Sequence, residues 1–136
     1  MRVVIDTNLY ISALMFGGLP GVLFDLMLAK SFETVVSPVL LDELEEKLCR
    51  KFEMSREDAV LIRAKITGVA TVIEPSETLH VIERDPDDDR VLECAVSGKA
   101  DVIISGDRDL LDLHNYQGIP VMRVREFLNS IDADTK

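Results

Sequence analysis

Several aspartates of this chain follow short apolar runs. Such runs usually form buried strands, which fix the position of the residues that follow them. Asp6 directly follows the apolar residues 3–5, and Asp107 comes shortly after the apolar residues 102–104. Between them, the series 85–89 contains four aspartates around a proline. Clustered carboxylates repel one another unless a positive charge lies among them, and oxygen ligands of this kind suit Mg²⁺ or Mn²⁺. The pattern indicates a small metal-dependent enzyme that acts on phosphates.

Apolar segments alternate with helical patterns along the chain. We expect strands at residues 2–5, 34–36, 71–73, 101–105 and 120–122. We expect helices at residues 8–15 and 21–30, from the N-cap Ser37 through Leu48, between the N-cap Ser55 and Gly68, and at 85–97, 110–113 and 125–130, with a break at 17–20. Such alternation predicts a parallel sheet with helices on both faces. Asp6 and Asp107 then lie at the carboxyl ends of the strands, where such sheets bind ligands.

Composition narrows the class of protein. A chain of 136 residues with 47% hydrophobic content predicts one domain with a real core. Cys49 and Cys94 show no zinc spacing or disulfide framework, so we expect free thiols and a cytoplasmic location. We expect no signal peptide and no membrane span, because no run of about 18 apolar residues occurs. The net charge of −10 argues against a broad nonspecific nucleic-acid binder.

Helical phase selects among the adjacent aspartates. Residues in a helix advance by about 100° each, and the apolar stripe of this helix consists of Val91, Leu92, Ala95 and Val96. Asp88 lies near the middle of that stripe, whereas Asp87 and Asp89 fall to either side. Asp88 is therefore expected to point inward, where an unpaired carboxylate is costly and a metal ion would compensate it. The alternative is that Asp88 only caps the first turn; Asp85 is the expected N-cap.

The other acids have simpler explanations that the residues alone leave open. Glu43 is four residues before Lys47, which is a favourable spacing for an ion pair on a helix surface. The apolar stripe of that helix does not select Glu43 over Glu45. Asp6 and Asp107 can equally form turns or cap helices where their strands end.

Taken together, these motifs resemble those of the PIN-domain ribonucleases, and among them the VapC-like toxins of bacterial and archaeal toxin–antitoxin systems. The matching segments are residues 3–8, 37–44, 85–95 and 104–111. They cover nearly the whole chain in the order of the family. Each motif alone is weak, and the ordered set is specific.

The resemblance assigns roles to particular residues. It implies that Mg²⁺ or Mn²⁺ is held, and catalysis carried out, by Asp6, Glu43, Asp88 and Asp107. It implies secondary roles for Asn8, Asp89, Ser105 and Asp109. Because similar proteins often have asparagine where Asp89 stands, Asp88 and Asp89 both stay candidates for one ligand position. For Glu43 the resemblance favours the metal site over the simple pairing with Lys47.

The resemblance also implies an overall fold. We expect an α/β protein with a three-layer α/β/α architecture and a central parallel sheet of strand order 3-2-1-4-5. Residues 1–131 would form a single PIN-like domain, and residues 132–136 would form a polar C-terminal tail.

The implied function is metal-dependent hydrolysis of RNA phosphodiester bonds by an endoribonuclease, as the toxin of a toxin–antitoxin pair. Its expected partners are an RNA substrate and an antitoxin protein, with no membrane. Local basic groups should hold the RNA backbone, and the candidates are Arg56, Lys65, Lys99 and Arg108. A homodimer is also expected through Leu19 and the apolar helix 21–30, unless Leu19, Phe24 and Leu28 complete the chain's own core.

Two other functions stay open at this point. One is a PIN-fold protein that processes or binds RNA without a toxin role; the presence of all four acids argues against a binding protein that does not cleave. The other is a metal-dependent phosphatase of the haloacid-dehalogenase type. That class calls for a second aspartate two residues after Asp6, where this chain has Asn8.

Overall fold

The computed structural model describes residues 1–82 and 84–134. In this part of the chain the strands are β1 (Arg2–Ile5), β2 (Glu33–Val36), β3 (Thr71–Val72), β4 (Val102–Ile104), β5 (Asn115–Tyr116) and β6 (Ile119–Met122). The helices are α1 (Thr7–Met15), α2 (Gly18–Leu28), α3 (Pro38–Lys51), α4 (Arg56–Thr67), α5 (Pro86–Ser97), α6 (Arg108–Leu111) and α7 (Val124–Asp134). Strands and helices alternate as the sequence predicts.

The strands form one sheet in the order β3-β2-β1-β4-β6-β5. The pairs from β3 to β6 are all parallel, which confirms the predicted class and the order of the five expected strands. The sheet differs from the prediction at its edge, where β5 pairs antiparallel with β6. The hairpin turn uses Gln117 and Gly118, both at positive φ, and the Asn115 side chain accepts a hydrogen bond from the Gly118 amide (2.9 Å). Asn115 and Tyr116 form no apolar run, so the sequence pattern does not predict this strand.

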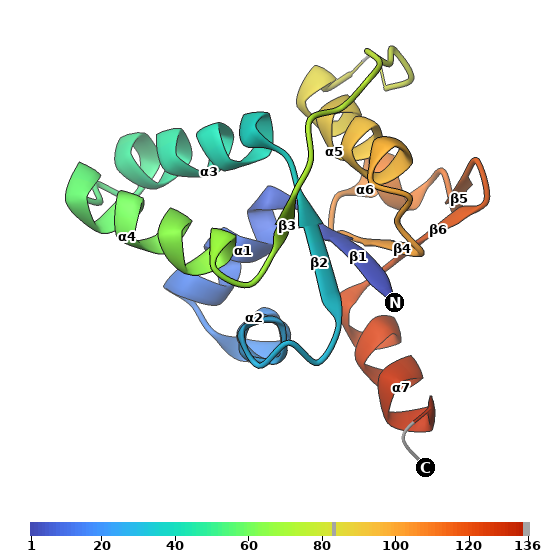
Figure 1. The fold of residues 1–136 in the computed structure, drawn as a ribbon, viewed down its shortest axis with the longest axis horizontal. Helices are drawn as coiled ribbons and strands as arrows, with labels where there is room; N and C mark the ends of the chain where they lie inside the picture. Colours follow the sequence, from blue (N-terminus) through green and yellow to red (C-terminus); the bar gives the residue numbers. More distant parts are fainter. Residues whose placement is uncertain (83, 135–136) are drawn as a thin grey trace.

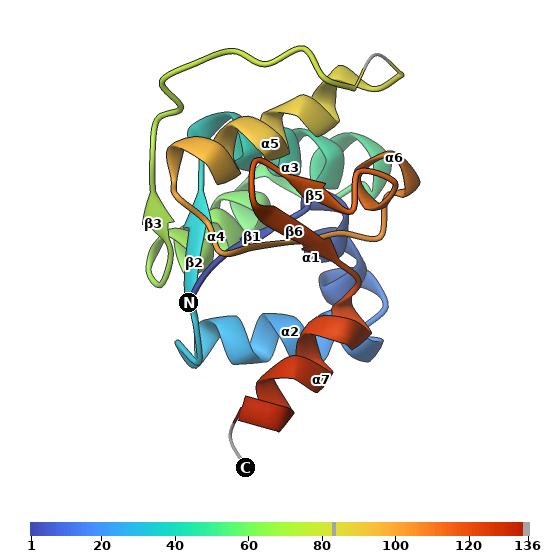
Figure 2. The same ribbon diagram turned by 90° about the vertical axis from the view of Figure 1, so that its right-hand side faces the viewer.

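Helices cover both faces of the sheet. In Figure 2, α3 and α5 lie above the sheet and α2 and α7 lie below it, which gives the expected three layers. Figure 1 shows α3 and α4 packed side by side as a pair that projects to one side of the sheet. The sheet's central strands are fully buried between these layers, with Val3, Val4, Ile103 and Ile104 at 0% exposure.

Several helix ends follow the predicted signals, and two do not. The Ser37 hydroxyl accepts from the Leu40 amide and that of Ser55 from the Asp58 amide, at 3.4 and 3.1 Å. The break predicted at 17–20 is shorter than expected, because α2 already begins at Gly18 and only Phe16 and Gly17 separate it from α1. Proline is tolerated in the first turn of a helix, so Pro20 does not stop it.

The last helix is longer than predicted. It runs over Val124–Asp134, so the segment expected as a polar tail begins inside the helix. Residues 135–136 of that predicted tail lie outside the described residues. Apolar side chains at Val124, Phe127, Leu128 and Ile131 pack on the core and carry the helix past Ser130, which is the i, i+3, i+4, i+7 spacing of an amphipathic helix.

The apolar helices α1 and α2 use most of their surface inside the chain. Leu19, Phe24 and Leu28 are partly buried and pack against the core, so the intramolecular explanation holds for these three residues. Phe16 and Val22 stay exposed, at 79% and 47%. No single helix in the described part is long and apolar enough to cross a membrane, and α1 and α2, which pass that test only together, are bent by 105°.

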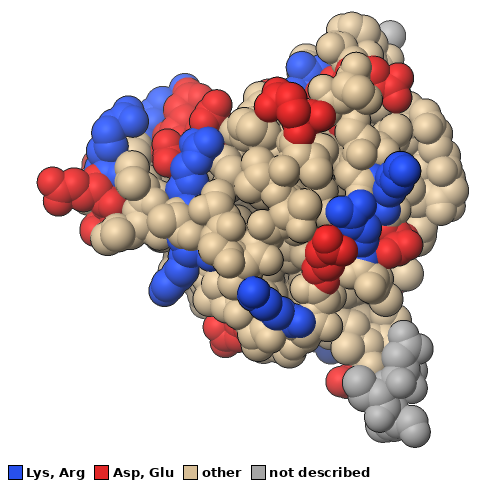
Figure 3. All heavy atoms as spheres, viewed as in Figure 1, with Lys and Arg blue, Asp and Glu red and all other residues tan. Residues whose placement is uncertain are grey.

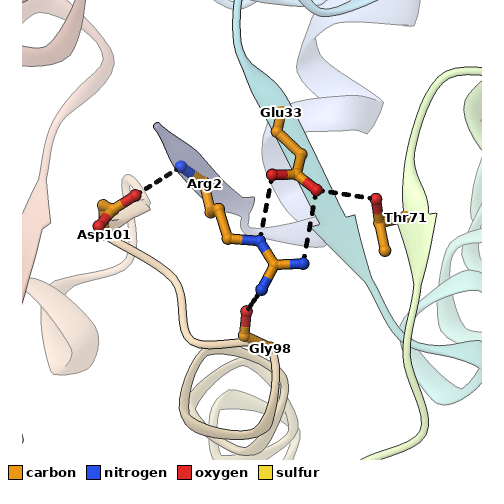
Figure 4. A network of polar contacts seen from close by, with 5 residues as sticks. All are labelled: Arg2, Glu33, Thr71, Gly98 and Asp101. Carbon is orange, nitrogen blue, oxygen red and sulfur yellow. Dashed lines mark hydrogen bonds and ion pairs between the residues drawn. The ribbon is translucent and has the colours of Figure 1, made fainter.

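A polar network joins the strands at the edge opposite Asp6 (Figure 4). The Arg2 guanidinium binds Glu33 through Nε (3.1 Å) and also donates to the Gly98 carbonyl. Thr71 donates to the same glutamate at 3.1 Å, and the Arg2 amide donates to the Asp101 carboxylate at 2.7 Å. The hydrogen bond from Arg2 lowers the pKa of Glu33. The network ties β1, β2 and β3 to the connection between α5 and β4.

Gly98 is expected to tolerate no larger residue, because α5 ends directly against β2. A Cβ atom there would lie 2.5 Å from Val35 Cγ1 and 2.8 Å from the Cys94 carbonyl oxygen. We expect Gly98→Ala to lower the free energy of unfolding by about 1–3 kcal/mol, the usual range for overpacking, in urea titrations.

Gly68 provides a matched control. It ends α4 with a similar φ of −67°, against −82° for Gly98. A Cβ atom at Gly68 would meet only backbone oxygens, the nearer at 3.3 Å. Gly68→Ala should therefore change stability little. Equal losses in the two variants would show that contact with Val35 is not the cause.

Candidate active site

Asp6 and Ser105 meet because β1 and β4 are neighbours. Ile5 pairs with Ile104 in parallel register, and the Asp6 amide donates to the Ile104 carbonyl at 2.9 Å. The next residues then face each other, and the Ser105 hydroxyl donates to Asp6 Oδ2 at 2.6 Å. Both side chains are buried. Burial raises the pKa of Asp6, and the hydrogen bond from Ser105 partly opposes that rise.

Ser105 also positions Asp107. Its hydroxyl oxygen accepts a hydrogen bond from the Asp107 amide at 2.9 Å, so one serine bridges the two acids that follow β1 and β4. Asp107 Oδ1 accepts from the amides of Asp109 and Leu110, at 2.8 and 3.4 Å, and so caps α6. Asp107 therefore caps a helix, as one alternative had it, and also lies beside other acids, as predicted. The two roles are compatible because the capping bonds use only one of its two carboxylate oxygens.

Asp88 enters the same space from the first turn of α5. Asp85, Asp88 and Asp107 each offer a carboxylate oxygen, and these oxygens lie within 4.8 Å of one another. Asp88 is 5% exposed, and its Oδ2 has no hydrogen-bond partner among the described residues. Burial, followed by the charge of Asp107, raises the pKa of Asp88 to about 8.

Asp85 was predicted only as the N-cap of α5. It has that role, since its Oδ1 accepts from the Asp87 amide at 3.1 Å. Its place beside Asp88 was missed, although a spacing of three residues at a helix start puts two side chains on one side. Its role as N-cap explains why position 85 holds a carboxylate, and the spacing of three residues explains why that carboxylate lies beside Asp88.

Asp89 is buried as well, which helical phase did not predict. Its Oδ1 accepts hydrogen bonds from the amides of Val81 and Ile82, at 3.0 and 2.9 Å. Glu93 Oε2, one turn further along α5, accepts from the Leu79 amide at 2.8 Å. The two acids therefore fasten the segment before α5 to the helix. The Asp89 carboxylate is hydrogen-bonded to backbone amides, whereas the Asp88 carboxylate faces the other carboxylates.

Glu43 approaches from α3 and is paired. Its Oε1 lies 2.8 Å from Lys47 Nζ, which is the ion pair that the spacing predicts. Lys47 also donates to Asn8 Oδ1 at 3.4 Å. Burial raises the pKa of Glu43, the bond to Lys47 lowers it, and the charges of Asp87 and Asp6 raise it further. Glu43 thus faces the cluster but stands apart from the group of three carboxylates that α5 and α6 bring together.

The predicted RNA-binding cations are dispersed. Arg108 directly follows Asp107 and its side chain is 90% exposed. Arg56 lines a hollow of about 360 Å³ between α3 and α4, and Lys99 lines another hollow beside Gln117. On the face shown in Figure 3, Lys and Arg side chains are interspersed with Asp and Glu. Of the four candidates, only Arg108 is placed by the chain next to a clustered acid.

Two cations near the acids were not among those candidates. Lys47 is in the cluster itself, and Arg84 lies 3.8 Å from Asp109 with its side chain 81% exposed. The spacing of Lys47 from Glu43 was the one signal that could have identified it. Arg84 belongs to the irregular segment before α5, where periodicity carries no information.

The donor set fits a hard divalent cation. All the converging groups are carboxylates, which Mg²⁺ and Mn²⁺ prefer. The buried, unpartnered Oδ2 of Asp88 is costly without a positive partner. The capping bonds of Asp85 and Asp107 involve the Oδ1 atoms, so a second oxygen of each carboxylate is left for another partner.

Comparison with known proteins identifies the family. The model of the PIN domain matches residues 2–109. The uncharacterized protein MJ1680 of Methanocaldococcus jannaschii is 34% identical over 120 residues, which are 85% of this chain and 76% of that protein. The chain belongs to the PIN domain family, whose members are generally nucleases.

Solved structures agree on the fold. PAE2754 from Pyrobaculum aerophilum superposes with a TM-score of 0.63 at 18% identity, covering 97% of this chain and 89% of that one. VapBC2 from Rickettsia felis, solved bound to a DNA fragment from their promoter, superposes with a TM-score of 0.63 at 14% identity, covering 90% and 98%. At these identities the likeness concerns the fold alone.

The Asp88 carboxyl should make stability depend on pH when chelator removes divalent ions. Its pKa rises from 3.8 to about 8 on folding, so the folded protein keeps a proton that the unfolded chain releases. This contribution is complete below pH 4 and is lost as the pH rises toward 8. We expect the free energy of unfolding to fall by at least about 1 kcal/mol between pH 5 and 8.5, and Asp88→Asn to remove that part of the slope.

Asp89→Ala is the neighbouring control. It removes the acceptor of two backbone amides and should cost about 1–3 kcal/mol at both pH values. Urea titrations in EDTA at pH 5 and 8.5 measure all three proteins. An Asp88→Asn variant that keeps the wild-type slope would mean that Asp88 does not carry the retained proton.

Proposed function

We propose that this protein is a metal-dependent endoribonuclease. The observation that carries the proposal is the buried, unpartnered oxygen of Asp88 beside Asp85 and Asp107, next to the serine-bridged Asp6. When ionised, a buried carboxylate of this kind needs a cation. Membership in a family of nucleases gives the cation a chemical purpose.

Particular residues have distinct tasks in this site. Asp6, Asp88 and Asp107 are the proposed ligands of Mg²⁺ or Mn²⁺, and Asp85 joins them. Glu43, the fourth expected ligand, is paired with Lys47. When bound, such a cation makes an attacking water more acidic and offsets the charge that develops on the scissile phosphate. The chain's own contribution is to fix the oxygens in advance, Asp6 and Asp107 through Ser105 and Asp88 through α5.

The surroundings of the ligands keep them in place. Asp89 and Glu93 hold the segment 79–82 against α5, so the helix that presents Asp88 is covered on its outer side. The backbone amide of Asn8 donates to Asp6 Oδ1 at 3.3 Å, and the side-chain oxygen of Asn8 accepts a hydrogen bond from Lys47. Asp109 donates its amide to Asp107.

RNA is the proposed substrate, and a toxin–antitoxin pair is the proposed setting. Support comes from the toxin-like motifs and from the shared fold with VapBC2, whose complex with a promoter DNA fragment is a property of that protein. We extend the proposal to an antitoxin partner and to a homodimer, for which Phe16 and Val22 remain exposed. A small DNA-binding protein encoded beside this chain would support the toxin role over RNA processing.

Removing a proposed ligand should abolish cleavage while the fold survives. We expect Asp6→Asn and Asp107→Asn each to reduce cleavage of RNA by at least about a hundredfold. Asp89→Asn should keep most activity, because an amide oxygen can still accept from the backbone. Asp112→Asn, at an exposed position after α6, is the control. Gel assays of RNA cleavage by the folded proteins with Mn²⁺ test this. Full activity of Asp6→Asn would contradict the assignment of Asp6 as a metal ligand.

Divalent cations should stabilise the folded protein. A cation that binds the folded site and not the unfolded chain adds about 2.7 kcal/mol at a hundredfold excess over its dissociation constant. The melting temperature at neutral pH should therefore rise with millimolar Mn²⁺. The gain should shrink as the pH falls, because protons compete for the same oxygens.

The control for the melting experiment is the double variant Asp6→Asn, Asp107→Asn. It should show little rise with Mn²⁺. A wild-type protein indifferent to Mn²⁺, or a double variant that gains as much as wild type, would contradict a metal site at these residues.

A further inference from the structure

Lys47 places a positive charge on the carboxylate cluster from within the chain. Its Nζ lies 2.8 Å from Glu43 Oε1 and 3.4 Å from Asn8 Oδ1, and its side chain is only 18% exposed. On the same helix, Arg50 makes the equivalent i,i+4 pair with Glu46, but both of those side chains are 65% exposed. Lys47 is thus held in a fixed place, in contrast to an ordinary pair on a helix surface.

The charge of Lys47 reaches several elements. The Lys47 ammonium is bonded to Glu43 and is also attracted by the charges of Asp87 and Asp6. These three acids come from α3, α5 and the end of β1. The ammonium therefore neutralises the α3 side of the site.

The two sides of the site differ in whether a positive charge of the chain is paired with their carboxylates. On the α5 and α6 side, Asp85, Asp88 and Asp107 converge with an unpartnered buried oxygen, and among the described residues no ion pair joins any of the three to a Lys or Arg. On the α3 side, Glu43 already has an ammonium at hydrogen-bond distance. A second divalent ion on the α3 side would have to displace Lys47 or approach it against repulsion.

We propose that the Lys47 ammonium occupies the place of a second metal ion, so that the protein binds a single divalent cation at the Asp88 side. This inference rests on the proposed nuclease function and specifies its metal content. Nucleases with two metals hold them about 3.5–4 Å apart, where they stabilise the attacking and leaving oxygens together. Here a fixed ammonium supplies the second positive centre.

The position of Lys47 also allows contact with a phosphate. A cleft of about 300 Å³ between α3 and α5 is lined by three cations and four acids, which are Lys47, Arg50 and Arg90 with Asp42, Glu43, Glu46 and Asp87. A lysine ammonium binds phosphate as a compact point charge. An RNA strand in this cleft would bring a phosphate to Lys47 while the neighbouring phosphate faces the carboxylates.

The test is the number of Mn²⁺ ions bound per chain, measured by electron paramagnetic resonance of free Mn²⁺ and by calorimetry. We expect one ion for the wild type and two for Lys47→Met, which removes the charge and keeps the length of the side chain. Adding Glu43→Gln to Lys47→Met should return the number to one. Lys47→Arg, which restores a cation, should bind one.

Arg50→Met is the matched control, since it breaks the exposed pair one turn further along α3, and it should bind one ion. Two ions on the wild type, or a single ion on Lys47→Met that remains folded by circular dichroism, would overturn the inference while leaving the proposed function intact. No Mn²⁺ binding by the wild type would overturn both. These outcomes do not depend on finding the RNA substrate.

Discussion

Several carboxylates lie side by side at the carboxyl edge of the sheet, and the repulsion between them constrains everything around them. The parallel register of β1 and β4 brings these acids together. It places Asp6 opposite Ser105, which is two residues before Asp107 in the chain. Burial intensifies the effect, since it raises the pKa of Asp6 and Asp88 and leaves an oxygen of Asp88 without a partner. The fold therefore keeps an arrangement that is unfavourable without a cation, and such arrangements concentrate at functional sites.

Helix capping is the device by which the chain tolerates this arrangement. Asp6, Asp85 and Asp107 are the N-caps of α1, α5 and α6, and backbone amides at a helix start favour a negative charge. Each of these aspartates thus receives local stabilisation that is independent of a metal. Asp88 lies in the first turn of its helix but is no cap, so its carboxyl depends most on a cation. For Asp85 and Asp107 the structural and functional explanations are compatible, because the capping bonds occupy only one oxygen of each carboxylate.

The sequence is informative where periodicity and helix signals are long, and uninformative where contacts join distant segments. The parallel strands, the N-caps Ser37 and Ser55, and the inward position of Asp88 follow from local patterns, and the structure has all of them. The hairpin of β5 and the burial of Asp89 do not, because the first contains no apolar run and the second depends on an irregular segment folding back on α5. For Glu43, spacing indicated the pair with Lys47 and the family resemblance indicated the cluster; the structure shows the pair, with Glu43 apart from the group of Asp85, Asp88 and Asp107.

The two edges of the sheet treat charge in opposite ways. At the amino edge, the Arg2 guanidinium meets oxygens from Glu33 and the end of α5, and the Arg2 amide donates to Asp101, so the starts of the strands are tied together (Figure 4). At the carboxyl edge, acids outnumber the cations, and the half-buried Lys47 is paired with Glu43. The strands are thus joined by opposite charges at one end and carry the mutual repulsion of carboxylates at the other. Carboxylates that the fold fixes in place while their charge is unbalanced are preorganised for a cation.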